Sequence, residues 1–75
     1  MKIKTYNSNW EIFVNGERVM SISTDADSIN PDLYESAYEI AEAIIEEIQT
    51  NGISVSEEEK EEIETLCEIH FSHWF

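Results

Sequence analysis

The dipeptide Asn15-Gly16 lies between two runs of strand-forming residues, WEIFV at 10–14 and ERVMSIS at 17–23. Both residues tolerate the positive φ that the two central positions of a type I′ turn require. The stretch therefore predicts an antiparallel β-hairpin. The weakly alternating segment KIKTY at 2–6 is a candidate third strand, and the sequence leaves its pairing partner open.

The turn also predicts a register for the hairpin. With a two-residue turn, Phe13 lies opposite Arg18 and Ile12 lies opposite Val19. This register places apolar side chains on both faces of the hairpin. One face carries Phe13, Met20 and Ile22, and the other carries Trp10, Ile12, Val14 and Val19.

A helix is predicted from about Pro31 to Thr50. Asn30 suits the N-cap position, with Pro31 as the first helical residue, and Asn51-Gly52 is a typical helix end. Apolar residues at helical spacing form one stripe, namely Leu33, Ala37, Ile40, Ala41, Ile44 and Ile48. Four glutamates lie opposite that stripe, namely Glu35, Glu39, Glu42 and Glu46.

A second helix begins with a capping box in which Ser56 is the N-cap and Glu59 the third helical residue. Its core stripe consists of Ile63, Leu66, Cys67, His70 and Trp74. Four glutamates again lie opposite, at the spacing found in the first helix, namely Glu57, Glu61, Glu64 and Glu68. The predicted fold is therefore α+β, a small antiparallel sheet of two or three strands followed by two amphipathic helices packed on one face, in a single domain of residues 1–75.

The charge of the chain is distributed unevenly. The net charge is -13; residues 1–24 contribute +1 (three basic and two acidic side chains) and residues 25–75 contribute -14 (one basic and 15 acidic). A surface this negative disfavours direct binding to nucleic acid or to anionic membranes and favours a basic protein partner. The alternative is that the acids serve only solubility.

The two glutamate stripes indicate how such a partner would be bound. Spacings of three and four residues place successive carboxylates about 4.5–6 Å apart along a helix axis, whereas the phosphates of one DNA strand give one charge per about 3.4 Å. Two parallel stripes would present charge on a scale that a phosphate-binding groove accepts. No nucleophile triad or phosphate-binding loop occurs, and the glutamates look alike and exposed, so we expect no enzymatic activity.

The end of the chain, CEIHFSHWF, gathers Cys67, His70 and His73, which include the only cysteine and both histidines. Thiolate and imidazole suit zinc, so a structural zinc ion is possible here, with a fourth ligand from Asp25 or Asp27, from a glutamate or from a second subunit. All three side chains are expected on the apolar side of the helix, and one ion could reach all three only if the last turn frays. The spacing is not that of a zinc finger, and ordinary core packing explains it as well.

The aromatic residues of the same segment have two interpretations. Trp74 continues the core stripe, whereas Phe71 and Phe75 fall nearer the acidic side, so that one or both are expected to be exposed. Exposed aromatics beside charge are typical of interface anchors, and a homodimer seam is the alternative use. A single cysteine, no apolar leader and no membrane-length apolar run favour a cytoplasmic protein.

The whole chain resembles the small acidic inhibitors that phages encode against host defence, of which anti-CRISPR proteins and other DNA mimics are the nearest group. The resemblance lies in size, in the charge of residues 25–75, and in a hairpin followed by ESAYEIAEAIIEEI and SEEEKEEIETLCEI. It implies a stoichiometric inhibitor, acting in the host cytoplasm, that occupies a basic groove of a nuclease such as a CRISPR-Cas effector. A small zinc-stabilised or homo-oligomeric interaction module is the alternative function.

Overall fold

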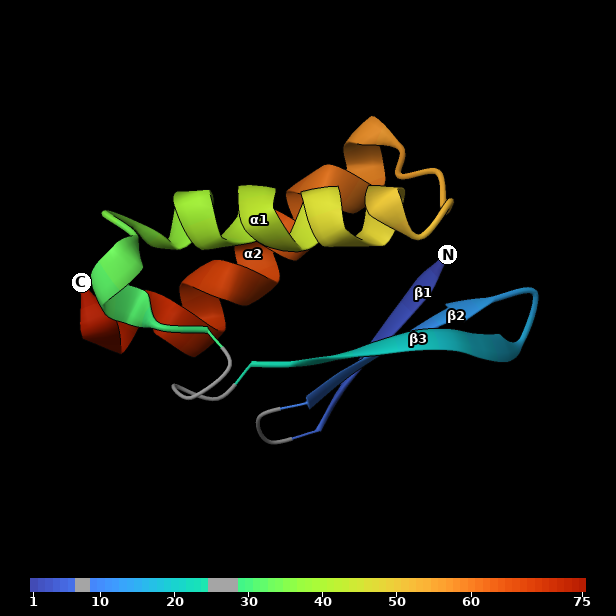
Figure 1. Ribbon diagram of the computed structural model, residues 1–75, viewed down its shortest axis with the longest axis horizontal. Coiled ribbons are helices and arrows are strands. Elements are labelled where there is room, and N and C mark those ends of the chain that lie inside the picture. Colours follow the sequence, from blue (N-terminus) through green and yellow to red (C-terminus); the bar gives the residue numbers. More distant parts are fainter. Residues whose placement is uncertain (7–8, 25–28) are drawn as a thin grey trace. The chain divides into compact units, whose positions relative to one another are not determined.

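The computed structural model describes residues 1–6, 9–24 and 29–75 (Figure 1). The chain forms two compact units, Met1–Asn30 and Pro31–Phe75. The first contains a three-stranded antiparallel sheet and the second contains two α-helices, which confirms the predicted α+β fold. The assignment of the chain to a single domain stays a prediction.

The sheet consists of β1 (Lys2–Tyr6), β2 (Asn9–Val14) and β3 (Glu17–Ser23), in the order β1-β2-β3. The segment KIKTY therefore pairs with β2, with Lys2 opposite Phe13. Because β2 hydrogen-bonds to a neighbour on each side, it is the central strand.

The turn between β2 and β3 is the one that its sequence predicts. Asn15 has φ 54° and Gly16 has φ 82°, so both central residues lie in the left-handed region as in a type I′ turn. Space is open around Gly16, where an added Cβ would meet no atom within 4 Å. The backbone conformation, and not crowding, is what requires glycine here.

The predicted register holds for only part of the hairpin. Phe13 pairs with Arg18 as expected, but Ile12 pairs with Met20 and not with Val19. A β-bulge between these pairs leaves Val19 as the extra residue of β3. A one-residue shift moves every later side chain of a strand to the opposite face, so the bulge reverses the predicted faces beyond it.

The bulge gathers the large apolar residues on one face. Trp10 pairs with Ile22 and Ile12 pairs with Met20, so these four share a face, contrary to the prediction. Trp10 and Ile12 are fully buried, whereas Val19 is 47% exposed. The bulge brings Met20 and Ile22 onto the face of Trp10 and Ile12 in place of Val19, so this face gathers more apolar surface than in the regular register, which favours the bulge.

The first helix begins later than its sequence pattern predicts. A short 3₁₀-helix, η1 (Pro31–Leu33), comes first, and α1 spans Ala37–Thr50. The N-cap is Ser36, whose hydroxyl accepts a hydrogen bond from the Glu39 backbone N–H at 3.4 Å. The predicted cap at Asn30 is therefore wrong, because a serine side chain three residues before a glutamate provides a competing start signal.

The end of α1 follows the prediction. The Gly52 backbone N–H donates to the Gln49 carbonyl at 2.9 Å, and the Ile53 N–H donates to the Ile48 carbonyl at 3.4 Å. Together with Gly52 at φ 82° these bonds form a Schellman motif, which satisfies the last helical carbonyls. The chain then turns directly into the second helix.

The second helix, α2, spans Glu57–Phe71 and continues as a 3₁₀-helix, η2 (Ser72–Trp74). Its predicted capping box is confirmed: the Glu59 N–H donates to the Ser56 hydroxyl at 3.2 Å, and the Ser56 N–H donates to Glu59 Oε1 at 2.8 Å. These two bonds satisfy backbone donors that would otherwise lack partners at the helix start.

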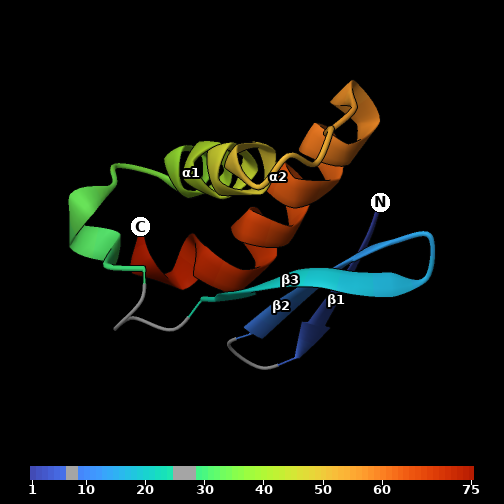
Figure 2. The same ribbon diagram turned by 45° about the vertical axis from the view of Figure 1, so that its right-hand side comes forward.

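The two helices pack against each other, and α2 crosses α1 in the views of Figures 1 and 2. The predicted stripes are largely buried, but Leu33 lies outside α1 and is 74% exposed. Phe71 is 1% exposed and Phe75 is 48% exposed, so one of the two aromatics is at the surface. The buried residues of the helices are Ala37, Ile40, Ala41, Ile44, Ile45, Ile48, Ile63, Cys67 and Phe71.

Within the part of the chain that the structure describes, no helix combines the length and the apolar character needed to cross a membrane.

Candidate functional site

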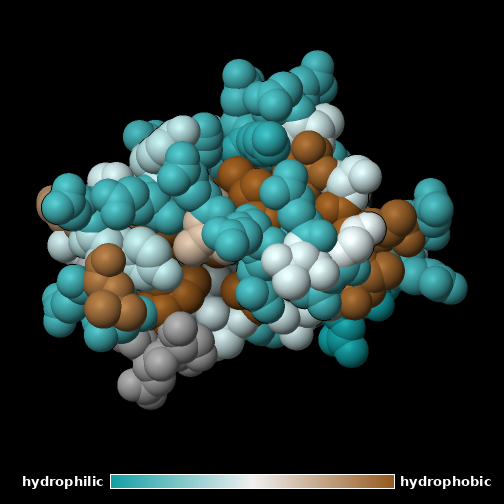
Figure 3. Space-filling model, turned by 45° about the horizontal axis from the view of Figure 1, so that its top comes forward, coloured by the Kyte–Doolittle hydropathy of each residue, from teal (hydrophilic) through white to brown (hydrophobic). Residues whose placement is uncertain are grey.

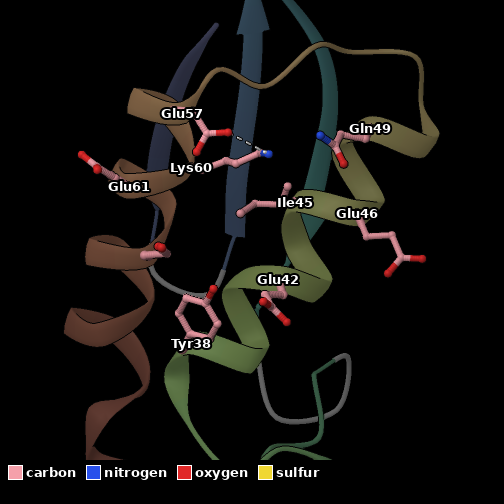
Figure 4. A pocket seen from close by; sticks show the side chains of 9 residues that line it. Tyr38, Glu42, Ile45, Glu46, Gln49, Glu57, Lys60 and Glu61 are labelled. Atoms are coloured by element: carbon pink, nitrogen blue, oxygen red, sulfur yellow. Dashed lines mark hydrogen bonds and ion pairs between the residues drawn. The ribbon is translucent and has the colours of Figure 1, made fainter.

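A groove runs between α1 and α2 and encloses about 510 Å³ (Figure 4). Its helices are joined by only a few residues and pack side by side, so side chains from both line it. The lining residues are Tyr38, Glu42, Ile45, Glu46, Gln49, Glu57, Lys60, Glu61 and Glu64. We refer to this feature as the acidic groove.

The floor and rims of the acidic groove differ in character. In Figure 4, Ile45 from α1 and Lys60 from α2 point into the space between the helices. Glu46 and Glu61 point outward from opposite sides. Carboxylates on the two rims therefore flank a floor that is partly apolar.

The electrostatic balance of the groove is strongly negative. Five glutamates line it against one lysine, which gives a formal charge of -4. Lys60 Nζ lies 3.4 Å from Glu57 Oε1, within the same helix. That exposed pair neutralises one carboxylate only weakly. The remaining four glutamates form no ion pair among the described residues.

Tyr38 connects the charges of the two helices. Its side chain is 56% exposed. A hydrogen bond to Glu42 raises the pKa of Tyr38, and the negative charges of Glu42 and Glu64 raise it further. Because Glu64 belongs to α2, the phenol of α1 lies within the field of both helices. A second hollow of about 200 Å³ extends from the same place and is lined by Tyr38, Glu64, Thr65 and Glu68.

The structure brings together six of the eight predicted partner-binding glutamates. Five line the acidic groove, and Glu68 lines the adjoining hollow with Glu64. The other two, Glu35 and Glu39, line neither the groove nor the hollow. Glu35 precedes α1, and Glu39 is in its first turn, where its backbone N–H donates to the Ser36 cap. The stripes also cross and do not run parallel, because the helices cross (Figure 2).

Sequence reasoning missed the other residues of the groove. The residues Tyr38, Ile45, Gln49 and Lys60 were not among the predicted binding residues. Lys60 is the one basic residue in residues 25–75. Its position as the single Lys or Arg in that acidic stretch is the one sequence signal that could have drawn attention to it.

Much of the molecular face drawn in Figure 3 is hydrophilic, with hydrophobic side chains visible between the polar ones. The described residues with the greatest exposure of large apolar or aromatic side chains are Tyr6, Val19, Leu33, Tyr38, Ile69 and Phe75.

The predicted zinc ligands lie in three different environments. Cys67 is fully buried, His70 is half-buried, and His73 is exposed within η2. Burial, together with the charge of Glu64, raises the pKa of the Cys67 thiol to about 12. The thiolate is the form that binds zinc, so a zinc ion would have to displace the proton of this buried thiol.

The histidines of this segment contact aromatic rings. The ring centroids of His73 and Trp74 are 4.9 Å apart, and those of His70 and Phe71 are 6.5 Å apart. The expectation that all three candidate ligands face the apolar side fails for His73, which is exposed in the 3₁₀-helix η2.

Across residues 1–6, 9–24 and 29–75 there is no group of three His, Cys, Asp or Glu side chains that could hold a metal ion. The candidate fourth ligands Asp25 and Asp27 lie outside the described residues. A structural zinc ion stays a prediction.

Comparison with known proteins adds no relative. No protein-family model, curated protein or solved structure matches this chain.

Proposed function

We propose that the chain is a non-enzymatic inhibitor that binds a basic nucleic-acid-binding protein, such as a CRISPR-Cas effector nuclease, through the acidic groove. The observation that supports this most is the convergence of glutamates from two helices on one groove that holds a single lysine. Clustered charge of one sign steers a partner of opposite charge and fixes its orientation.

The groove offers more than charge. Ile45 provides an apolar contact on its floor, and Tyr38 provides an exposed ring beside Glu42. Guanidinium groups form forked hydrogen bonds with carboxylates and stack on aromatic rings. An arginine-rich surface that normally binds phosphates would therefore find both kinds of contact here.

The proposal is tested with purified, guide-loaded CRISPR-Cas effector nucleases of several types, assayed for inhibition of DNA cleavage and for direct binding. The groove variant carries Glu42→Gln, Glu46→Gln, Glu61→Gln and Glu64→Gln. The control variant carries Glu17→Gln, Glu47→Gln, Glu58→Gln and Glu62→Gln, which removes the same charge from residues that do not line the groove.

We expect the groove variant to bind at least about tenfold more weakly and the control variant to bind nearly as the natural chain does, since contacting charges outweigh distant ones. Binding should also weaken steeply as salt rises. Equal loss in the two variants, affinity that does not change with salt, or no inhibition of any effector would contradict the proposal.

A further inference from the structure

The sheet unit has a pocket of its own, separate from the acidic groove. It encloses about 320 Å³ and is lined by Met1, Lys2, Lys4, Phe13, Asn15 and Gly16. None of these residues is acidic, although the chain contains 17 Asp and Glu residues. We refer to this feature as the basic pocket.

Strand pairing explains why these residues meet. Lys2 lies opposite Phe13 in the pairing of β1 with β2, and alternation along β1 places Lys4 on the same face as Lys2. Lys4 Nζ lies 4.8 Å from the centroid of the Phe13 ring, a cation–π contact. Both residues of the Asn15-Gly16 turn also line the pocket, and an added Cβ at Gly16 would meet no atom within 4 Å.

The two lysines of the basic pocket, Lys2 and Lys4, have no carboxylate partner within residues 1–6, 9–24 and 29–75. Glu11 is the cross-strand partner of Lys4, but its Oε2 lies 3.3 Å from Nη1 of Arg18 instead. The Glu11 carboxylate is therefore paired with Arg18, and the Lys2 and Lys4 residues are both exposed.

We infer that the basic pocket binds a small phosphate ester of the nucleoside-phosphate class. Two ammonium groups supply charge for a phosphate, the Asn15 amide supplies a neutral polar contact, and Phe13 supplies an apolar wall for the organic part. The pocket is open to solvent, and its volume is at the lower end of the range for small-molecule sites, about 300–1,000 Å³.

The pocket selects a small ligand over a nucleic-acid strand. The net charge of the chain is -13, so repulsion grows with the number of phosphates in a ligand and is far greater for a nucleic-acid strand than for a single nucleotide. This inference does not depend on the proposed inhibitor function, because the basic pocket and the acidic groove share no residue and carry charges of opposite sign.

The test is a titration of the isotope-labelled chain with ATP, without divalent metal, followed by amide chemical shifts in NMR spectra. We expect saturable shift changes concentrated in residues 1–6 and 13–18, with a dissociation constant on the order of 1 mM for exposed charge contacts. No shift change in these segments at several millimolar ATP would overturn the inference.

Three single substitutions separate a site from a general charge effect. Lys2→Gln and Lys4→Gln should each weaken ATP binding about threefold or more, in line with the modest energy of an exposed ion pair. Lys60→Gln removes the same charge from the helix unit and should leave binding unchanged. If Lys60→Gln weakens binding as much as the other two, the inference fails. Circular dichroism of each variant verifies that it is folded.

Two further ligands define the class. Inorganic pyrophosphate should bind more weakly than ATP, because it has no organic part to contact Phe13. An oligothymidylate of twelve nucleotides should also bind more weakly than ATP, because the negative chain repels a long polyanion. Equal binding of pyrophosphate would overturn the assignment to an ester, and tighter binding of the oligonucleotide would overturn the assignment to a small ligand.

Discussion

Glu59 illustrates how one carboxylate both caps a helix and responds to pH. Its hydrogen bond from the Ser56 backbone N–H lowers its pKa below the usual range. A carboxylate with a lowered folded-state pKa stabilises the fold above its unfolded pKa, and this contribution is lost as pH falls through the folded value.

We therefore expect Glu59→Gln to lower the free energy of unfolding at neutral pH and to have a much smaller effect near pH 3. The measurement is urea denaturation at several pH values. Glu58→Gln, which removes the same charge next to the cap, serves as the control and should not show this loss. A cost for Glu59→Gln that is independent of pH would contradict the role of its charge in the cap.

Cys67 gives a second prediction for a single side chain. A pKa of about 12 leaves only about one thiol in ten thousand ionised at pH 8, and the side chain is fully buried. Reaction with a thiol reagent should therefore be slow in the native chain and fast in denaturant. Rapid native-state labelling would show that the segment opens, or that its thiol is activated as a zinc ligand would need.

The secondary-structure elements show where local sequence is a reliable guide. Asn15-Gly16, Gly52 and the Ser56 capping box each specify a conformation through bonds within a few residues, and each prediction is confirmed. The bulge at Val19 brings Met20 and Ile22 onto the face of the buried Trp10 and Ile12, and no local signal encodes that choice of register. The start of α1 was placed too early because Asn30-Pro31 resembles a cap as closely as Ser36 does.

The acidic groove was predictable only in part, because it too depends on contacts between residues that are distant in the sequence. Helical spacing identifies glutamates on one face of each helix, but the groove depends on how α1 and α2 cross. Lys60 and Gln49 enter it through that packing. The basic pocket escaped prediction entirely, because it requires the pairing of β1 with β2, which the sequence left open.

Phe71 and Phe75 provide a matched pair for the packing of the helix end. Phe71 is 1% exposed and its ring centroid lies 5.1 Å from that of Trp74, whereas Phe75 is 48% exposed. Phe71→Ala should cost about 3–5 kcal/mol of stability and Phe75→Ala less than about 1 kcal/mol. Chemical denaturation measures both. Comparable costs would show that Phe75 is buried in solution, for example in a homodimer, which sedimentation would then detect.

For the molecule as a whole, repulsion among like charges is the main expected liability. Both helices carry glutamates four residues apart, such as Glu42 with Glu46 and Glu64 with Glu68, and such pairs destabilise a helix. Raising ionic strength from about 0.01 M to 0.15 M shortens the screening length from about 30 Å to 8 Å.

The melting temperature should therefore rise with sodium chloride over this range, as measured by circular dichroism. The groove variant with four Glu→Gln substitutions should melt higher at low salt and respond less to added salt. A melting temperature that falls with salt would mean that attractive pairs, such as Arg18 with Glu11, outweigh the repulsion.

The order β1-β2-β3 has a consequence for how readily the sheet could pair with the sheet of another chain. Two of its three strands are edge strands, whose outer N–H and C=O groups are a template for pairing with another chain. Lysines at alternate positions of β1 place charge along one edge, and the bulge at Val19 bends the other out of the flat geometry that strand addition needs. The bulge at Val19, which the sequence does not predict, therefore also protects the sheet against edge-to-edge aggregation.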